Sequence, residues 1–285
     1  MVYQIKNDTS KEGNGMLKRF VSSYPVLFSI IVMGTVTLAT EAGLATLFER
    51  AMGKQEAAYL AGILEQGICS ILMVCLLKKL NLLKSGGFTK MKEWKQVWMI
   101  FPLVVLSALN AISSVGEGFV LDTSRPLLLV LFVLLFLAVG FVEEILFRSV
   151  ILNVLMQKWA DTKRGVYLSV IASSLIFGAI HLMNLIMGRY ELLPALTQLA
   201  YALFFGVFFA ACFLRTNTVW PVIVMHAIFD ICGNLREISV NSSFGSLVQT
   251  TPQNSLLTIL VTLPLFIYGL ILLRKVGPMK PIVTV

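Results

Sequence analysis

An uncharged run, PLLLVLFVLLFLAVGFV, occupies residues 126–142, and only lipid or the centre of a large helical bundle can accommodate it. The whole chain shares this character, because 57% of its 285 residues are hydrophobic and only 13% are charged. Soluble domains have a much lower apolar share. The sequence therefore predicts a polytopic integral membrane protein whose immediate surroundings are the lipid bilayer.

Seven further apolar segments accompany this run, and most approach the length of about 20 residues that a helix needs to cross a bilayer. Long runs of Leu, Ile, Val and Phe favour helices at membrane depth. We therefore expect an all-α membrane helix bundle of about eight transmembrane helices. The eight segments are residues 21–48, 57–77, 96–114, 126–147, 166–187, 194–214, 218–235 and 255–274.

The same segments divide the chain into four parts. These are a cytoplasmic tail (1–20), the first three transmembrane helices (21–125), a core of helices four to seven that carries the polar motifs described below (126–235), and an external loop with the eighth helix and a cytoplasmic tail (236–285).

Lysine and arginine are concentrated in alternate loops, and flanking positive charge resists translocation across the membrane. The loop at 78–95 is predicted to be cytoplasmic and the loop at 236–254 external, with both termini cytoplasmic. The net charge of +8 is then explained by topology and by attraction to anionic lipid, and no nucleic-acid partner is expected. The basic clusters lie at 6–19, 78–95, 158–164, 215 and 274–280.

Three charged residues directly follow the uncharged run: Glu143, Glu144 and Arg148. Ionised groups at membrane depth are costly and are normally paired or functional. Along a helix, Glu144 and Arg148 are four residues apart and share a face, whereas Glu143 points well away from Arg148. The spacing predicts a pair between Glu144 and Arg148, which leaves Glu143 for another role.

The two histidines of the chain both lie in apolar segments. His226 and Asp230 are one helical turn apart, so the carboxylate can hold one imidazole tautomer or both groups can face one ligand. His181 lies in the preceding motif-bearing region. A lone intramembrane histidine can instead serve as an interhelical hydrogen-bonding group. Together, however, these residues predict a polar cluster contributed by three helices.

The depths of the two histidines differ in an idealised bundle. His181 lies about 25 Å from Arg164 along a straight helix, whereas His226 is only 11 residues beyond Arg215. Two arrangements reconcile them. Either residues 149–165 continue the fourth helix before the chain bends back, or the site occupies a deep cavity that opens to the cytoplasm.

These residues carry a family resemblance. EEILFR at 143–148, FGAIH at 177–181 and HAIFD at 226–230 resemble the EExxxR, FxxxH and HxxxD/N motifs of the CAAX-processing and bacteriocin-processing (CPBP) intramembrane proteases, also called the Abi or Rce1-like family. The motifs match in order and spacing, and the resemblance covers residues 126–235. The third motif ends in Asp230, as in many bacterial relatives, whereas the eukaryotic prenyl-protein proteases resemble HxxxN.

The resemblance implies an intramembrane endopeptidase of the bacterial cell membrane that hydrolyses a peptide or membrane-protein substrate. It makes Glu143 the general base that activates water. His181 and His226 would position that water or stabilise the oxyanion, and Asp230 would orient His226. The remaining motif residues, Glu144, Arg148 and Phe177, would have structural roles.

Other mechanisms and functions stay open at this stage. Glu143, His181 and His226 offer ligand atoms that zinc accepts, although HExxH is absent and the resemblance favours a mechanism without a cofactor. A non-catalytic immunity or regulatory protein of the same fold would keep the architecture without the chemistry. A transporter would also place such groups at membrane depth, but the chain lacks the internal repeat that transporters usually show.

Overall fold

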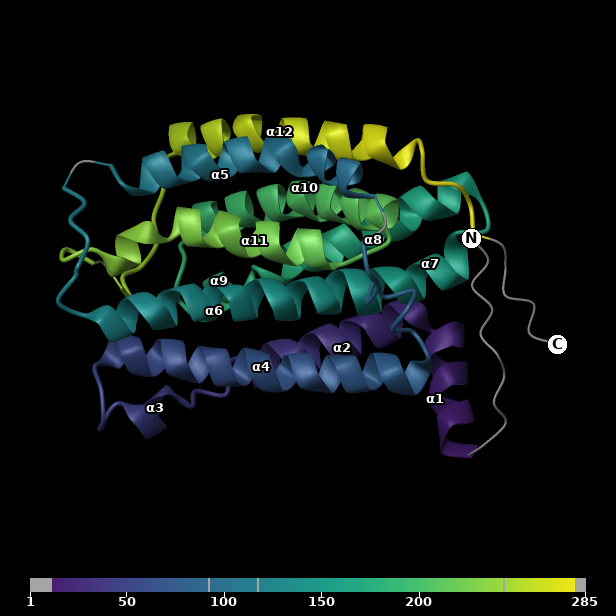
Figure 1. The fold of residues 1–285 in the computed structure, drawn as a ribbon, viewed down its shortest axis with the longest axis horizontal. Coiled ribbons are helices and arrows are strands. Elements are labelled where there is room, and N and C mark those ends of the chain that lie inside the picture. Colours follow the sequence, from purple (N-terminus) through teal and green to yellow (C-terminus); the bar gives the residue numbers. More distant parts are fainter. Residues whose placement is uncertain (1–11, 92, 117, 243, 280–285) are drawn as a thin grey trace.

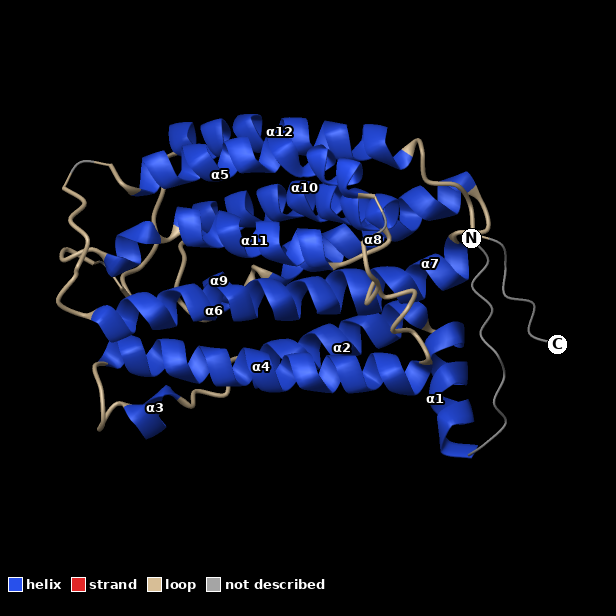
Figure 2. Ribbon diagram, in the orientation of Figure 1, coloured by secondary structure: helices blue, strands red, loops and turns tan. Residues whose placement is uncertain are grey.

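The computed structural model describes residues 12–279 except 92, 117 and 243, and this part of the chain is a bundle of helices lying along one axis (Figures 1 and 2). No β-strand occurs among these residues; two isolated bridges join loop positions Leu121 to Ser239 and Tyr190 to Val248. The all-α prediction is confirmed. Most of the predicted 1–20 tail lies outside the described residues, and its last part belongs to a helix.

The helices follow one another with short connections. Their bounds are α1 Glu12–Ser23, α2 Pro25–Ala39, α3 Ala45–Phe48, α4 Lys54–Leu80, the 3₁₀-helix η1 Trp94–Ile100, α5 Phe101–Ser114, α6 Pro126–Glu144, the π-helix η2 Ile145–Leu152, α7 Asn153–Trp159, α8 Lys163–Ile180, α9 Met183–Ile186, α10 Leu192–Thr216, α11 Trp220–Gly233, the 3₁₀-helix η3 Leu235–Ile238 and α12 Pro252–Leu273.

Six helical stretches among the described residues are long and apolar enough to cross a membrane, or seven if the bent pair α1 and α2 counts as one span. The chain is an integral membrane protein. Each of the eight predicted segments contains a helix, but α2 has 15 residues and α11 has 14, both short of the length of about 20 that a crossing needs. The predicted count of eight transmembrane helices is therefore not confirmed.

The prediction of one helix over residues 21–48 is wrong. α2 ends at Ala39, and the chain turns through Gly43, whose φ of +76° favours glycine, before the short helix α3 begins. The backbone N–H of Leu44 donates to Glu65 Oε1 at 3.0 Å, so a carboxylate from α4 satisfies the turn. The break depends on this contact between distant segments.

The fourth predicted segment extends further than expected, because one apolar stretch runs from Pro126 to Trp159 through α6, η2 and α7. This agrees with the arrangement in which the fourth helix continues before the chain bends back. Measured from the α7–α8 turn along the helices, Glu143 lies about 24 Å away and His181 about 27 Å away. Glu143 and His181 therefore lie at similar depth along the bundle.

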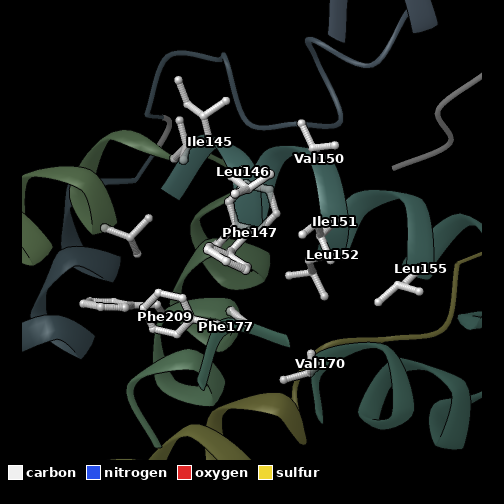
Figure 3. Packing of buried hydrophobic residues seen from close by; sticks show 14 of the residues in the cluster. Ile145, Leu146, Phe147, Val150, Ile151, Leu152, Leu155, Val170, Phe177 and Phe209 are labelled. Carbon is white, nitrogen blue, oxygen red and sulfur yellow. The ribbon is translucent and has the colours of Figure 1, made fainter. Parts of the chain in front are cut away.

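The helices form two sets that meet at η2. α6 packs between α4 and α11, and α11 also packs against α5, whereas α10 packs between α8 and α12. η2 contacts members of both sets, and its residues are all buried. Figure 3 shows this junction, where η2 side chains such as Phe147 and Ile151 meet Val170, Phe177 and Phe209 from α8 and α10. Fully buried side chains thus surround the motif residues.

The connection between α4 and η1 folds against the bundle instead of lying free. Ser149 Oγ of η2 donates to the Gly86 carbonyl at 2.6 Å, and the backbone N–H of Val219 donates to the Gly87 carbonyl at 3.1 Å. The hydroxyl of Thr218 donates to the carbonyl of Thr89 at 2.9 Å. The turn between α10 and α11 is thereby held beside η2, so α11 begins deep and His226 reaches the level of Glu143.

Substituting Ala for Gly87 is expected to loosen this junction. Gly87 has a φ of +83°, and a Cβ there would come within 2.5 Å of Phe213 Cε2 and 2.9 Å of the Val219 nitrogen. Gly118 has a nearly identical φ of +82° with no atom within 4 Å of an added Cβ, so its Ala variant reports the backbone cost alone, about 1–2 kcal/mol. In detergent, the melting temperature of Gly87→Ala should fall several degrees below that of Gly118→Ala. Equal melting temperatures would show that the Gly87 contact is unimportant.

Candidate active site

One imidazole lies at the centre of the polar cluster. His226 Nδ1 donates to Glu144 Oε1 at 2.8 Å, because a carboxylate engaged by an arginine can only accept. His226 Nε2 faces Glu143 Oε2 at 3.6 Å and Asp230 Oδ2 at 3.4 Å. The end of α6 and the middle of α11 therefore bring three carboxylates to one ring. Figure 1 shows these two helices side by side.

The pair that helical spacing predicts is present. Arg148 Nε and Nη2 donate to Glu144 Oε2 and Oε1 at 2.8 and 3.2 Å, and both side chains are completely buried. The guanidinium lies over the rings of Phe177 and Phe209, with centroid distances of 4.9 and 5.6 Å. Glu144 is thus fixed by Arg148 and in turn fixes His226.

Glu143 differs from its neighbour. Its Oε2 is buried, yet within the described residues it has no hydrogen-bond partner, and the whole side chain is 21% exposed. The 3.6 Å separation from His226 Nε2 is too long for a hydrogen bond. Buried carboxylate oxygens are normally hydrogen-bonded, so an unengaged one needs an explanation. Glu143 Oε2 is available to accept a proton.

His181 lies immediately after the last residue of α8, where the helix ends inside the bundle. Its ring is 5.2 Å from that of Phe177, at an interplanar angle of 71°. Phe177 also meets the His226 ring at 6.0 Å and 89°. The second motif therefore places an aromatic ring in edge contact with both imidazoles, and Phe177 is the packing element that relates them.

The sequence does not reveal one residue of the site, Phe209, and one contact, between Glu144 and His226. Phe209 stacks on His226 with a centroid distance of 5.3 Å and an interplanar angle of 25°, so it fixes the ring plane. It belongs to the run FFGVFFAACF in α10, which resembles any buried apolar stretch and contains no polar signal. The missed contact joins Glu144 of α6 to His226 of α11, and the spacing of residues within one helix cannot reveal it.

Metal-ligand geometry is not found in this part of the chain. Among the described residues, no three His, Cys, Asp or Glu side chains are arranged to hold a metal ion. The zinc ligands considered from the sequence, Glu143, His181 and His226, do not form such a group in this arrangement.

Comparison with known families places the site in context. Residues 125–232 match a family model described as "Rce1-like: Type II CAAX prenyl endopeptidase Rce1-like", a range that contains all three motifs. No curated protein and no solved structure matches the chain. The match supports a protease set in the membrane and acting on a peptide substrate. Residues 125–232 are therefore similar to the Rce1-like family of CAAX prenyl endopeptidases, in agreement with the three motifs.

Proposed function

We propose that this protein is an intramembrane endopeptidase in which Glu143 activates the water that attacks a peptide bond. The observation that carries the proposal is that Glu143 Oε2 has no hydrogen-bond partner among the described residues and faces His226 Nε2 within a cluster of charged side chains. A general base must reach the proton it abstracts, and no donor in the described part of the chain occupies Oε2.

The proposed reaction follows from these positions. Water attacks the peptide carbonyl carbon while one of its protons passes to Glu143 Oε2. The carbonyl oxygen becomes an oxyanion, and collapse of the intermediate breaks the C–N bond as Glu143 returns the proton to the leaving amine. One water is consumed and two peptide fragments leave, so the residue ends in its initial state.

His226 and His181 supply the donors in this proposal. As an imidazolium, His226 donates with both nitrogens, from Nδ1 to Glu144 and from Nε2 towards the substrate oxygen. Because Phe209 and Glu144 already fix the ring, little reorganisation is needed when charge develops on that oxygen. Asp230 assists by holding Nε2 on the substrate side. Arg148 holds Glu144 in place, and Phe177 packs against the rings of both histidines.

The proposal also includes the orientation of the protein in the membrane and the class of substrate. In this proposal the basic loops and both termini face the cytoplasm of a bacterial cell membrane. The positions of α1 and of the end of α12 support it, since both lie at the same end of the bundle as the basic α7–α8 turn (Figure 1). The substrate is a peptide or a membrane protein. No cofactor is required.

Purified protein in detergent tests this proposal with a pool of internally quenched peptides. Cleavage should persist after prolonged treatment with a strong chelator, and bound zinc should be well below one equivalent, because Glu143 needs no Lewis acid to activate water. Preparations of Glu143→Gln made in parallel control for contaminating peptidases. Activity that is lost on chelation and restored by zinc would make Glu143, His181 and His226 ligands. Absence of any cleavage above the control would contradict the proposed function.

A further inference from the structure

The first helix lies across the end of the bundle instead of along it. α1 meets α2 at an angle of 107°, and the bend falls at Tyr24, whose φ of −128° and ψ of 58° are not helical. Proline disfavours the helical conformation in the residue before it and cannot donate an N–H, so Pro25 breaks the helix there. Phe20 of α1 packs edge-on against Phe28 of α2, with ring centroids 6.5 Å apart, which holds the two helices at this angle.

The position of α1 is that of a helix at a membrane surface. α2 packs against α4, α7 and α8, which run along the bundle. Figure 1 shows α1 standing across these helices at the end that carries the α7–α8 turn, with its beginning beyond α4. Membrane-spanning helices tilt by only about 20° on average from the bilayer normal. A helix that crosses their ends therefore lies close to the plane of the membrane surface.

One face of α1 is apolar and is only partly covered by the protein. Met16, Leu17, Phe20 and Val21 have the spacing of three and four residues that places side chains on one helix face. Val21 is buried, and Leu17 and Phe20 pack partly against the core. Met16 lies nearer the beginning of the helix and is 78% exposed. The bundle thus covers the later part of this face and leaves the part at Met16 for another apolar surface.

The other face of α1 is polar and basic. Lys18, Arg19 and Ser22 lie there, and Arg19 and Ser22 are exposed. Three more exposed lysines lie on α4 and α7, which contact α1: Lys78, Lys79 and Lys158. We call these three lysines, Lys18 and Arg19 the α1 basic patch. Among the side chains that the structure describes, none of the five forms an ion pair. The patch therefore presents positive charge that no carboxylate of the described chain neutralises.

We propose that α1 and the α1 basic patch bind anionic phospholipid headgroups at the membrane surface, with Met16 inserted into the apolar layer beneath them. The headgroup phosphate accepts charge-assisted hydrogen bonds from arginine and lysine, and the acyl chains cover the apolar surface that the bundle leaves open. A helix with one apolar and one basic face is the form that binds such a surface. The inference goes beyond the proposed peptidase activity, which uses no residue of α1.

The depth of α1 provides the first test. In a cysteine-free background, a spin label is attached to a cysteine that replaces either Met16 or Ser22, and the protein is placed in nanodiscs of phosphatidylcholine and phosphatidylglycerol. The label at position 16 should be relaxed more by oxygen, which concentrates among acyl chains, than by a water-soluble nickel chelate. The label at position 22 should show the opposite preference. Equal access of the chelate to both labels would place α1 in water and overturn the inference.

Lipid selectivity provides the second test. In detergent, titration with short-chain phosphatidylglycerol should change the fluorescence of a dye on a cysteine at Ser22. The apparent Kd should be about tenfold or more below that for phosphatidylcholine, since basic residues at the membrane surface attract anionic lipid. Combining Lys18→Gln with Arg19→Gln should raise the Kd for phosphatidylglycerol by about tenfold or more. The melting temperature and peptide cleavage in detergent should stay unchanged, because neither side chain touches the catalytic groups.

The matched control combines Arg50→Gln with Lys54→Gln, which removes two exposed cations at the opposite end of the bundle. Its Kd for phosphatidylglycerol should stay close to that of the parent protein. An equal rise in this control, or no preference of the parent for phosphatidylglycerol, would refute the lipid site. Inorganic phosphate that displaces the lipid at the same concentration would indicate a site for free anions and would also overturn the inference.

Discussion

Glu143→Gln is expected to lower kcat by about 10²–10⁴-fold while the protein accumulates and folds normally. The amide has nearly the shape of the carboxylate but cannot accept and return a proton. Folding should be retained because Glu143 Oε2 has no hydrogen-bond partner among the described residues, so no structural contact is lost. The measurement is peptide cleavage by protein matched for yield, melting temperature and elution volume.

Glu65→Gln is the matched control for this experiment. Glu65 is also a buried carboxylate within an apolar helix, but it accepts from the Leu44 backbone, a bond that a glutamine oxygen can also accept. Its activity should stay close to that of the parent protein. If Glu143→Gln retains activity, the general-base role is refuted. If it also preserves a cellular phenotype while purified protein shows no cleavage, the non-catalytic immunity or regulatory function is favoured.

The sequence predicts those features of the architecture that depend on local composition and on spacing within one helix. The apolar segments identify the membrane helices because nothing else can bury such runs. Helical spacing alone distinguishes Glu144, which reaches Arg148, from Glu143, which does not. The match over residues 125–232 agrees with the region that the motifs define.

The features that depend on contacts between distant segments are not predicted. The end of α2 requires the Glu65 carboxylate from α4, and the depth of α11 requires a loop that folds against η2. The sequence also does not predict that α6 continues through a fully buried π-helix. The residues Ile145–Leu152 have the pattern of an ordinary α-helix, and the π-helical geometry is visible only in the packed structure. π-helical turns are rare and often occur at functional sites, and here one begins directly after Glu144.

Arg148→Ala is expected to have the largest effect on stability. The substitution leaves the completely buried Glu144 carboxylate without its cation, and breaking a buried pair in this way costs about 3–5 kcal/mol. It also removes the guanidinium that packs over Phe177 and Phe209. The yield of monodisperse protein in fluorescence-detected size-exclusion chromatography should fall sharply, and the remaining protein should melt at a lower temperature.

Arg189→Ala supplies the control for this prediction. Arg189 also forms a two-bonded pair, with Glu41, but its side chain is 49% exposed, and pairs of this kind contribute only about 0–1 kcal/mol. Its yield should therefore remain close to that of the parent. Arg148→Lys should be intermediate, because it keeps the charge without the bidentate geometry. Normal yield of Arg148→Ala together with loss of Glu143→Gln would mean that the two glutamates have exchanged the roles assigned to them.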